Sequence, residues 1–476
     1  MSCLKLGRKL EYQNIIRNDK LYKNGEDMKY TIYDTETTGL HFRFDYALTF
    51  SAKTVDDKFN IIDEINLTTK LRPGMIPSVY AIATNKLKIS ELNKSVLSFY
   101  EMTKKIHKYF KKHSPSYVIG HNSLKFDEEI LRSHFYQCLL PVYITQSNGS
   151  VRADTLIMAR AASAFSPNSI KINNNNKNKL DFTLEGIASA NNFSHSKAHT
   201  AESDVIACIE ILKKISSCDH SFFKSCLKTA SKNGIEKFIS ENYAFCFFKS
   251  INKKLLLTNC IKLNSYYLGF DLTKDPDDFK QLSALDLIQV INKKNSPFHI
   301  FKNNKQSILL DLSYKKFTNC NLNNQEIFSK AKKIQSDLNF KNNLKIALEL
   351  INNTSHNNET VEEKIFSEGF PNKIDQNLMD KFHKYDWDKR SKIINKFEDP
   401  RFKELSARLV YEHNPMLLDK KSVKLIEKKL HEKLYMDINR PRNIYQAKKE
   451  LNDFLEKNPN ANLAPIVELK NYINSI

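Results

Sequence analysis

Two acidic residues, Asp34 and Glu36, stand two positions apart in the short segment IYDTETTGL. If that segment is a strand, both side chains lie on one face of it, because side chains alternate along a strand. Carboxylates held together repel each other unless water or a divalent cation lies between them, and hard oxygen ligands suit Mg²⁺ or Mn²⁺. Taken alone, the pair is more commonly a solvated strand end than a metal site.

Two further acidic residues and a histidine follow in two later segments. GHNSLKFDEEI places Asp127 at the start of a predicted helix, and KAHTAESDVIA places His199 before another helix with Asp204 in its first turn. Thr200 is the expected N-cap of that second helix. Each residue also has an ordinary explanation, since an acid in a first turn suits the helix dipole and a histidine before a helix is usually not catalytic.

A mixed α/β sheet is the architecture predicted to position these residues. Apolar alternation indicates strands, helical periodicity indicates helices, and an Asn-rich segment indicates a loop. Strands followed by alternating helices and a further strand are typical of a mixed sheet. The predicted strands are 30–34, 46–55, 59–67 and 116–120, the predicted helices are 95–110, 126–140, 153–165, 183–192 and 200–215, and the loop is 171–179.

The rest of the chain divides by texture into a β-rich part and a helical part. Short strands between turns are predicted over 245–272 and 296–313, a polar linker over 352–364, and helices from about Gln376. Two amphipathic helices, 422–435 and 443–457, are separated by a break at Pro441. The predicted division is a polar leader over 1–29, an α/β domain over 30–217, a β-rich domain over 218–355 and a helical domain over 356–476.

The composition favours a polyanionic partner. Among 476 residues, 74 Lys and Arg oppose 54 Asp and Glu, for a formal charge of +20. Nucleic acid is the usual partner of such a surplus, although part of it reflects the Lys- and Asn-rich composition of AT-rich coding sequence. The eight cysteines form no CxxC pair, which disfavours zinc. No secretory segment or run of about 20 apolar residues is present, so a soluble cytoplasmic protein with free thiols is expected.

The three motifs together resemble the proofreading-type 3′→5′ exonuclease superfamily. D-x-E, N-x-x-x-F-D and H-x-x-x-x-D occur in this order within one predicted α/β unit. The resemblance implies a ribonuclease H-like fold in which four acids gather two Mg²⁺ ions, with Mn²⁺ as an alternative. Asp34, Glu36 and Asp204 would hold the first ion, and Asp34 with Asp127 the second. His199 would be the general base that takes a proton from the attacking water.

The domain layout is similar to that of the bacterial exodeoxyribonuclease I family. GFPNKIDQ and FEDPRFKELSARLVYEHNP also resemble that family's helical domain. The resemblance implies an SH3-like β-rich domain and a monomeric enzyme of DNA repair and recombination. It would degrade single-stranded DNA processively from 3′ to 5′ and release 5′-mononucleotides. It also implies a protein partner, the acidic C-terminal tail of single-stranded-DNA-binding protein, although the pocket for that tail cannot be matched residue by residue.

Candidate residues for contact with the DNA strand follow from the same resemblance. Glu36 and Arg132 would contact the DNA, Tyr143 would stack on a base, and Arg160 would bind a phosphate. The arginines are as well explained as solvated helix positions, and Tyr143 as a packed ring. Where the family has an arginine before the Leu-Glu of FTLEGIA, this chain has Thr183, so one substrate contact is expected to be lost or shifted.

Two other functions are compatible with the sequence. A related exonuclease could act on RNA or short oligonucleotides, because the metal site does not read the 2′-hydroxyl. A catalytically inactive nucleic-acid-binding scaffold is the non-enzymatic alternative, but all five catalytic-type residues are present. Processivity, the metal used in the cell and the role of the leader are not determined by the sequence.

Overall fold

The structure is a computed structural model that describes residues 29–193, 200–351, 360–365, 369–436, 442–459 and 463–476. Four expectations lie wholly or mainly outside the described residues: the leader apart from Lys29, the general base His199, most of the predicted linker, and the break at Pro441.

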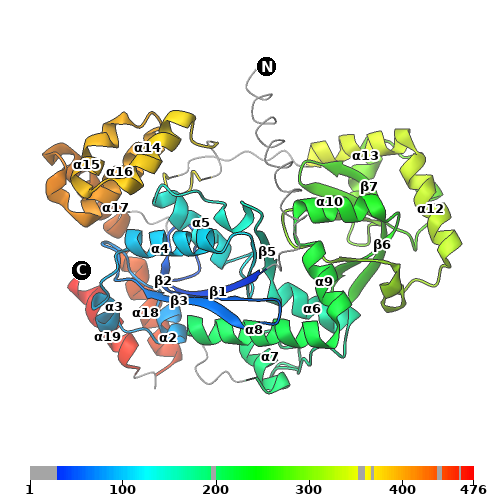
Figure 1. The fold of residues 1–476 in the computed structure, drawn as a ribbon, viewed down its shortest axis with the longest axis horizontal. Coiled ribbons are helices and arrows are strands. Elements are labelled where there is room, and N and C mark those ends of the chain that lie inside the picture. Colours follow the sequence, from blue (N-terminus) through cyan, green and yellow to red (C-terminus); the bar gives the residue numbers. More distant parts are fainter. Residues whose placement is uncertain (1–28, 194–199, 352–359, 366–368, 437–441, 460–462) are drawn as a thin grey trace.

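A five-stranded mixed sheet forms the centre of the molecule (Figure 1). Its strand order is β3-β2-β1-β4-β5; β1 pairs antiparallel with β2 and parallel with β4. The sheet confirms the predicted fold class, and β5 is a strand where the sequence suggested the start of a helix. The strands are β1 (Lys29–Thr37), β2 (Ala47–Val55), β3 (Ile61–Thr68), β4 (Ser116–Gly120) and β5 (Val151–Asp154).

Successive residues of β1 enter different hydrophobic cores on the two faces of this sheet. Ile32 packs in a core with Val205 and Leu212, whereas Tyr33 packs in another with Phe110 and Phe135. The second face is covered by α4 and α5, and the first by α6 and α8 (Figure 1). The helices of this unit are α2 (Val79–Asn85), α3 (Ile89–Asn93), α4 (Phe99–Lys112), α5 (Asp127–Gln137), α6 (Thr155–Phe165), α7 (Leu184–Asn191) and α8 (Ala201–Cys218).

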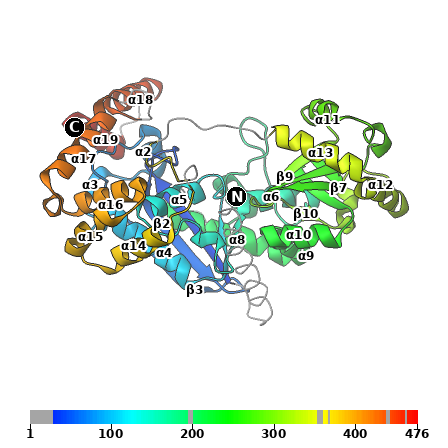
Figure 2. The ribbon, with the colours of Figure 1, turned by 90° about the horizontal axis from the view of Figure 1, so that it is seen from above.

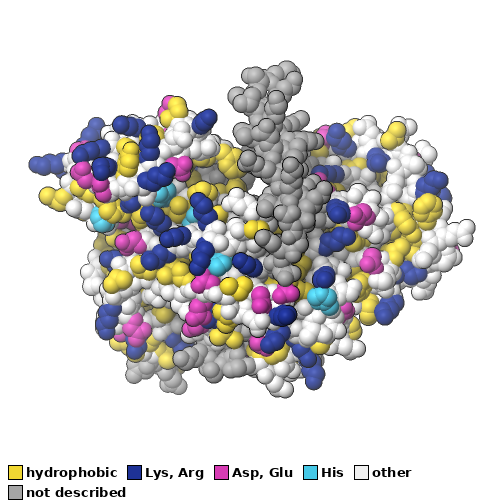
Figure 3. All heavy atoms as spheres, in the orientation of Figure 1, with side chains coloured by type: hydrophobic (Ala, Val, Ile, Leu, Met, Phe, Trp, Pro, Cys, Tyr) yellow, Lys and Arg dark blue, Asp and Glu magenta, His cyan; other side chains and the backbone are white. Residues whose placement is uncertain are grey.

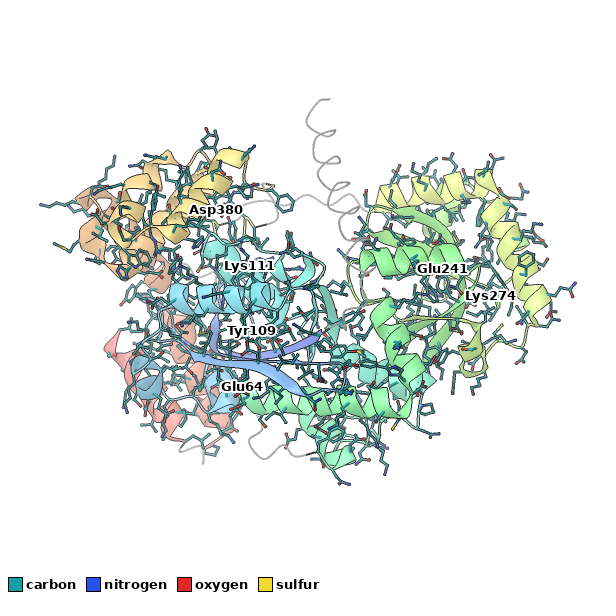
Figure 4. The ribbon with its side chains drawn as sticks, in the orientation of Figure 1. Glu64, Tyr109, Lys111, Glu241, Lys274 and Asp380 are labelled. Carbon is teal, nitrogen blue, oxygen red and sulfur yellow. The ribbon has the colours of Figure 1, made fainter. Side chains whose placement is uncertain are left out.

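Helix α4 is attached to the edge of the sheet by polar contacts as well as by its apolar face. Ser98 and Glu101 form a capping box at its first turn, which satisfies otherwise unpaired backbone groups. Tyr109 lies between the helix and the sheet (Figure 4), and its hydroxyl donates to the carbonyl of Asp63 at 3.0 Å. Lys111 lies on the exposed side of the same helix. The helix therefore presents lysines to solvent and aromatic rings to the sheet.

A second five-stranded sheet follows, fully antiparallel, with the order β10-β6-β7-β8-β9. Its strands confirm the short strands predicted between turns, but the described residues of this part also form five α-helices that the sequence analysis did not identify. The strands are β6 (Phe245–Ser250), β7 (Lys253–Leu263), β8 (Tyr266–Asp271), β9 (Phe298–Lys302) and β10 (Leu309–Leu310), and the helices are α9 (His220–Lys228), α10 (Lys232–Glu241), α11 (Ala284–Ile291), α12 (Asn324–Ser336) and α13 (Leu338–Ile351).

The C-terminal part is helical, as predicted, and shares a hydrophobic core with the first sheet unit. Leu48 and Phe99 from the first unit pack in the same cluster as Phe382, Leu451 and Ile466. Figure 2 shows the C-terminal helices and the second sheet on opposite sides of the first sheet. The helices are α14 (Lys373–Lys384), α15 (Trp387–Ile393), α16 (Pro400–His413), α17 (Lys420–Tyr435), α18 (Ile444–Lys457) and α19 (Ala464–Ser475).

The only tryptophan of the chain lies where α15, α16 and α4 meet. The Trp387 ring stacks on His413 with a centroid distance of 4.1 Å and lies edge-on to Tyr100 at 5.2 Å. The Arg390 guanidinium lies 4.1 Å from the Trp387 ring. Aromatic and cation–π contacts thus join the helical part to α4.

We propose the domain limits 30–217, 218–355 and 356–476 for the three units. The first limit falls at the end of α8, which the structure ends at Cys218. No helix within the described residues is both long enough and apolar enough to cross a membrane.

Candidate active site

Three of the predicted metal ligands converge at the end of β1. One carboxylate oxygen from each of Asp34, Glu36 and Asp204 lies within 4.8 Å of the others. Asp34 and Glu36 share the face of β1 that packs on α8, as their spacing predicted, and Asp204 lies in the first turn of α8. The sheet and one helix therefore bring together acids that are about 170 residues apart in the chain.

The fourth acid, Asp127, borders this cluster from the other side of the sheet. It is buried at the first position of α5, and its carboxylate accepts a hydrogen bond from the hydroxyl of Thr35 on β1. Its charge raises the pKa of both Asp34 and Glu36, as expected for neighbouring carboxylates. All four acids thus lie at one end of β1.

Burial and mutual repulsion oppose ionisation of the cluster. Burial, followed by the charges of Asp127, Glu36 and Asp204, raises the pKa of Asp34 well above its usual range. Burial and then the charge of Asp204 raise the pKa of Glu36 to about 8. Burial likewise raises the pKa of Asp127 to about 7, against the hydrogen bond from Thr35. Carboxylates that resist ionisation alone are ionised readily beside divalent cations, so this all-oxygen donor set fits Mg²⁺ or Mn²⁺.

Local contacts fix the start of α8, which carries Asp204. The side chain of Thr200 accepts a hydrogen bond from the amide of Ser203 at 3.4 Å, so Thr200 is the predicted N-cap. Lys53 of β2, which is almost fully buried, bonds Glu64 of β3 and Glu202 of α8, the latter at 3.4 Å. This buried cation joins the sheet to the first turn of α8.

A second buried network fixes the start of α5, next to Asp127. The Glu128 carboxylate accepts hydrogen bonds from the Tyr33 hydroxyl at 3.3 Å, from the Thr145 hydroxyl at 2.5 Å and from Arg152 at 3.4 Å. Arg152 also donates to the carbonyl of Asn304, in the loop between β9 and β10, at 3.1 Å. Arg152 therefore connects a loop of the second sheet to Glu128, the residue that follows the candidate metal ligand Asp127.

Arg132 and Tyr143, which are predicted to contact DNA, lie together in the structure. Arg132, however, is buried and paired with acidic side chains. It forms ion pairs of 3.2 Å with Glu128 and Glu129, and its guanidinium lies 5.1 Å from the Tyr143 ring. Tyr143 in turn lies edge-on to Phe370 at 5.9 Å, and Phe370 is 75% exposed. Arg132 thus supports an aromatic surface, and its contact with DNA stays a prediction.

Arg160 and Thr183 lie on neighbouring segments. Arg160 is exposed on α6, and its guanidinium lies 5.6 Å from the Phe182 ring. Thr183 is the N-cap of α7 and accepts a hydrogen bond from the Gly186 amide at 3.0 Å. The residue that replaces the family's arginine therefore has a structural role of its own.

A groove of about 740 Å³ opens beside Glu36. Its walls come from the end of β1, the loop after it, α2, and the start of α18 with the residues before it. The sequence analysis did not identify the contribution of the C-terminal residues, which no local motif marks. The lining residues are Thr35, Glu36, Thr37, Gly39, Leu40, His41, Asp45, Ser78, Tyr80, Ala81, Thr84, Asn85, Phe126, Arg442, Gln446 and Glu450.

Comparisons with known proteins match two family models to this chain. The family model described as Exonuclease matches residues 31–212, and the model of the Exonuclease I C-terminal domain matches residues 359–476. The exodeoxyribonuclease I of Buchnera aphidicola subsp. Baizongia pistaciae is 27% identical over 94% of this chain and 93% of its own length. That of Escherichia coli K12 is 28% identical over 39% of each chain.

Solved structures share the fold over nearly the whole chain. Exonuclease I from Methylocaldum szegediense has a TM-score of 0.80 at 18% identity, covering 94% of this chain and 99% of that one. E. coli exonuclease I in complex with a dA16 oligonucleotide has a TM-score of 0.78 at 17% identity, with the same coverage. The fold and the acidic cluster define an exonuclease with a ribonuclease H-like domain. Within that class, the chain is similar to the exonuclease I family, since the Exonuclease model and the Exonuclease I C-terminal domain model match it in that order.

Proposed function

We propose that this protein degrades single-stranded DNA from its 3′ end and releases 5′-mononucleotides by hydrolysis at two divalent cations. The observation that carries the proposal is the convergence of Asp34, Glu36 and Asp204 within 4.8 Å, with Asp127 beside them. Related proteins named exodeoxyribonuclease I cover most of the chain, and neighbouring structures hold DNA oligonucleotides.

Each acid has a distinct role in this proposal. Asp34, Glu36 and Asp204 would hold one Mg²⁺ ion, and Asp34 with Asp127 the other. When bound, such a pair of cations offsets the charge of the phosphodiester, activates a water molecule and stabilises the leaving 3′ oxygen. His199 would accept the proton of that water, since an imidazole titrates near neutral pH. The rigid ends of β1, α5 and α8 would keep the carboxylates in place throughout.

The groove beside Glu36 would receive the 3′-terminal nucleotide. Its apolar wall includes Leu40, Tyr80 and Phe126, which suit the faces of a sugar and a base, while Glu36 marks the end where the phosphate is cut. Tyr143 and Phe370 offer ring surfaces farther along, where preceding bases could stack. The aromatic pair extends the predicted contact at Tyr143 by one residue that the sequence analysis missed.

The charge of the surface favours a polyanionic strand. Figure 3 shows many Lys and Arg side chains over the C-terminal helices and α4. On α4, Lys104, Lys108 and Lys111 are exposed. Such a surface would attract DNA over a distance and in a salt-dependent way.

We also propose a protein partner and a location. A solved structure of SSB with exonuclease I shares this fold, with a TM-score of 0.77 at 17% identity. By analogy, the chain would bind the acidic tail of single-stranded-DNA-binding protein, which a pull-down with the tail peptide and a scrambled peptide would test.

The cysteines within the described residues are all free, which suits the reducing cytoplasm.

One experiment tests polarity, product and metal dependence together. Long single-stranded DNA, labelled at the 5′ end in one set and uniformly in another, is incubated with Mg²⁺, with Mn²⁺ or with EDTA. The proposal expects progressive shortening from the 3′ end, mononucleotide products and no reaction in EDTA. RNA of the same sequence, run in parallel, is expected to be degraded much more slowly. Faster RNA cleavage would favour the RNA alternative, and no cleavage of either would favour a binding scaffold.

A further inference from the structure

The loop that follows Glu36 forms one wall of the groove, and it is held by the C-terminal part of the chain. Gly39, Leu40 and His41 from this loop line the groove together with Arg442 and Glu450. A second link between the same two parts is the hydrogen bond from the hydroxyl of Ser78 to the Glu450 carboxylate, at 2.5 Å. The groove is therefore built between the exonuclease domain and the C-terminal helices.

Asp45 is the anchor of this loop, and Arg442 is its charged partner. The Asp45 carboxylate is almost fully buried and accepts hydrogen bonds from the Thr38 hydroxyl at 2.7 Å and from the His41 amide at 2.8 Å. It also accepts a short ion-paired hydrogen bond from the Arg442 guanidinium, 397 residues away in the chain. A buried carboxylate needs such a partner, so removal of Arg442 leaves a charge inside the loop compensated only by neutral donors.

Gly39 fits this arrangement for a steric reason. A Cβ atom at this position would overlap the Arg442 guanidinium and the Asp45 carboxylate. The backbone of Gly39 is not in the left-handed region, so the absence of a side chain serves packing and not conformation. The guanidinium thus lies directly against the loop backbone, three residues after Glu36.

We propose that Arg442 is a positioning residue for the reaction: through Asp45 it holds residues 38–45 in the shape that receives the 3′-terminal nucleotide. This inference rests on the proposed function. It makes the C-terminal part a component of the nucleotide-binding groove, in addition to any role in binding DNA elsewhere. The acids that hold the cations are separate from this contact, so the change is expected in substrate binding and not in the chemical step.

The experiment compares Arg442→Ala, Arg442→Lys and Gly39→Ala with wild type on a short single-stranded oligonucleotide, where few other contacts assist binding. Arg442→Ala is expected to raise KM about tenfold and change kcat less than about threefold. Arg442→Lys keeps a cation and is expected to recover KM to within about threefold of wild type. Gly39→Ala keeps both charges but displaces the guanidinium, and is expected to raise KM as Arg442→Ala does. Lys448→Ala, an exposed lysine of α18, is the matched control and is expected to leave KM unchanged.

The outcomes separate this inference from the proposed function. An inactive wild type overturns the proposed function and this inference with it. An active wild type whose KM is unchanged in both Arg442→Ala and Gly39→Ala overturns the inference alone. Equal losses in kcat for the alanine and lysine variants, with KM unchanged, also overturn it. Circular dichroism shows whether each variant is folded, and if Arg442→Ala is unfolded, Gly39→Ala decides.

Discussion

At the residue scale, the candidate site concentrates negative charge in a half-buried place. Asp34, Glu36 and Asp204 are close enough for a single cation to contact all three, and Asp127 raises the pKa of the first two. Without cations, the folded chain retains protons on Asp34, Glu36 and Asp127 that the unfolded chain would lose, because their pKa values are raised. The stability of the protein is therefore linked to pH when metal is absent, and to metal concentration when metal is added.

The first prediction concerns this linkage. A carboxyl whose pKa is higher in the folded than in the unfolded chain stabilises the fold less as pH rises between the two values. For Glu36 the window runs from the usual 4.5 to about 8, and for Asp127 from 3.8 to about 7. The metal-free protein is expected to melt about 2–5 °C lower at pH 8 than at pH 5.5, and Mg²⁺ or Mn²⁺ to restore the melting temperature at pH 8.

Calorimetry on the EDTA-treated protein measures this effect. The double variant Asp34→Asn, Glu36→Gln lacks two of the carboxyls with raised pKa values and serves as the control, since its difference from wild type separates the titration of the site from that of the histidines. A difference curve that stays flat between pH 5.5 and 8 would contradict the pKa shifts.

The second prediction concerns the general base. His199→Ala retains every candidate metal ligand, so DNA binding is expected to persist while the chemical step slows by a factor of about 10² to 10⁴. Single-turnover hydrolysis measures the rate, and a gel shift in Ca²⁺ measures binding. An undiminished single-turnover rate would remove His199 from the mechanism.

At the element scale, each ligand-bearing element is fastened at the end that carries the ligand. Glu128 fastens the start of α5 beside Asp127, and Lys53 fastens the start of α8 near Asp204. Deeper in the same elements, apolar side chains such as Ile32 of β1 and Ile130 of α5 pack in the hydrophobic cores on the two faces of the sheet. The polar contacts at these ends oppose small displacements that would alter the distances between carboxylates.

The third prediction tests the attachment at Lys53. Replacement of a buried ion pair by an apolar side chain of similar volume is often neutral for stability, and the partners Glu64 and Glu202 remain about half exposed to water. The free energy of unfolding of Lys53→Met is therefore expected to lie within about 1 kcal/mol of the wild-type value. The start of α8 loses its charged contact with the sheet, so kcat is expected to fall about three- to tenfold. Urea unfolding measures the stability, and steady-state kinetics measure kcat. Lys53→Arg, which keeps the cation, is the control. An unchanged kcat in Lys53→Met would contradict the role given to Lys53.

At the scale of the whole molecule, buried charges join segments that are distant in sequence. Arg408 of α16 bonds Glu362 at 2.7 Å and Glu412 at 3.0 Å, and Arg72 of the exonuclease domain bonds Glu412 at 2.8 Å. Burial opposes the charge of Glu362, but the attraction of Arg408 lowers its pKa to about 2. This network links residues 360–365, the C-terminal helices and the exonuclease domain.

The fourth prediction follows from that network. Arg408→Met removes the ion-paired partner of the buried Glu362 carboxylate, which keeps only the weaker attraction of Lys433 and Arg72, and is expected to destabilise the protein by about 3 kcal/mol. The double variant Arg408→Met, Glu362→Met removes both charges and is expected to be less destabilised than the single one. Urea unfolding measures both, and a single variant within about 0.5 kcal/mol of wild type would contradict the network's importance.

Features with a local signal were predictable from the sequence. Alternation placed Asp34 and Glu36 on one face, and the cap at Thr200 was marked by residue type. The pairing of Arg132 with Glu128 and Glu129 was not predicted, although residues three and four apart meet on a helix. Helix α12 was missed, although its capping box of Asn323 and Glu326 was a local signal.

Features that depend on distant segments were not predictable. The meeting of Arg442 with Gly39 and Asp45 is set by how the C-terminal helices dock, and no spacing in the chain encodes it. The ring contact between Tyr143 and Phe370 depends on the same docking. A single sequence identifies which residues can do chemistry more readily than which ones hold them in place.

The lone Trp387, stacked on His413 and beside Arg390, gives the protein a single indole fluorophore, excited selectively at wavelengths where tyrosine does not absorb, at the joint between its helical part and α4. Its emission therefore reports on that joint without any added label and without interference from a second indole. A shift in wavelength or intensity when a DNA strand is added would reveal a movement of the helices, and an unchanged spectrum would indicate a joint that stays closed.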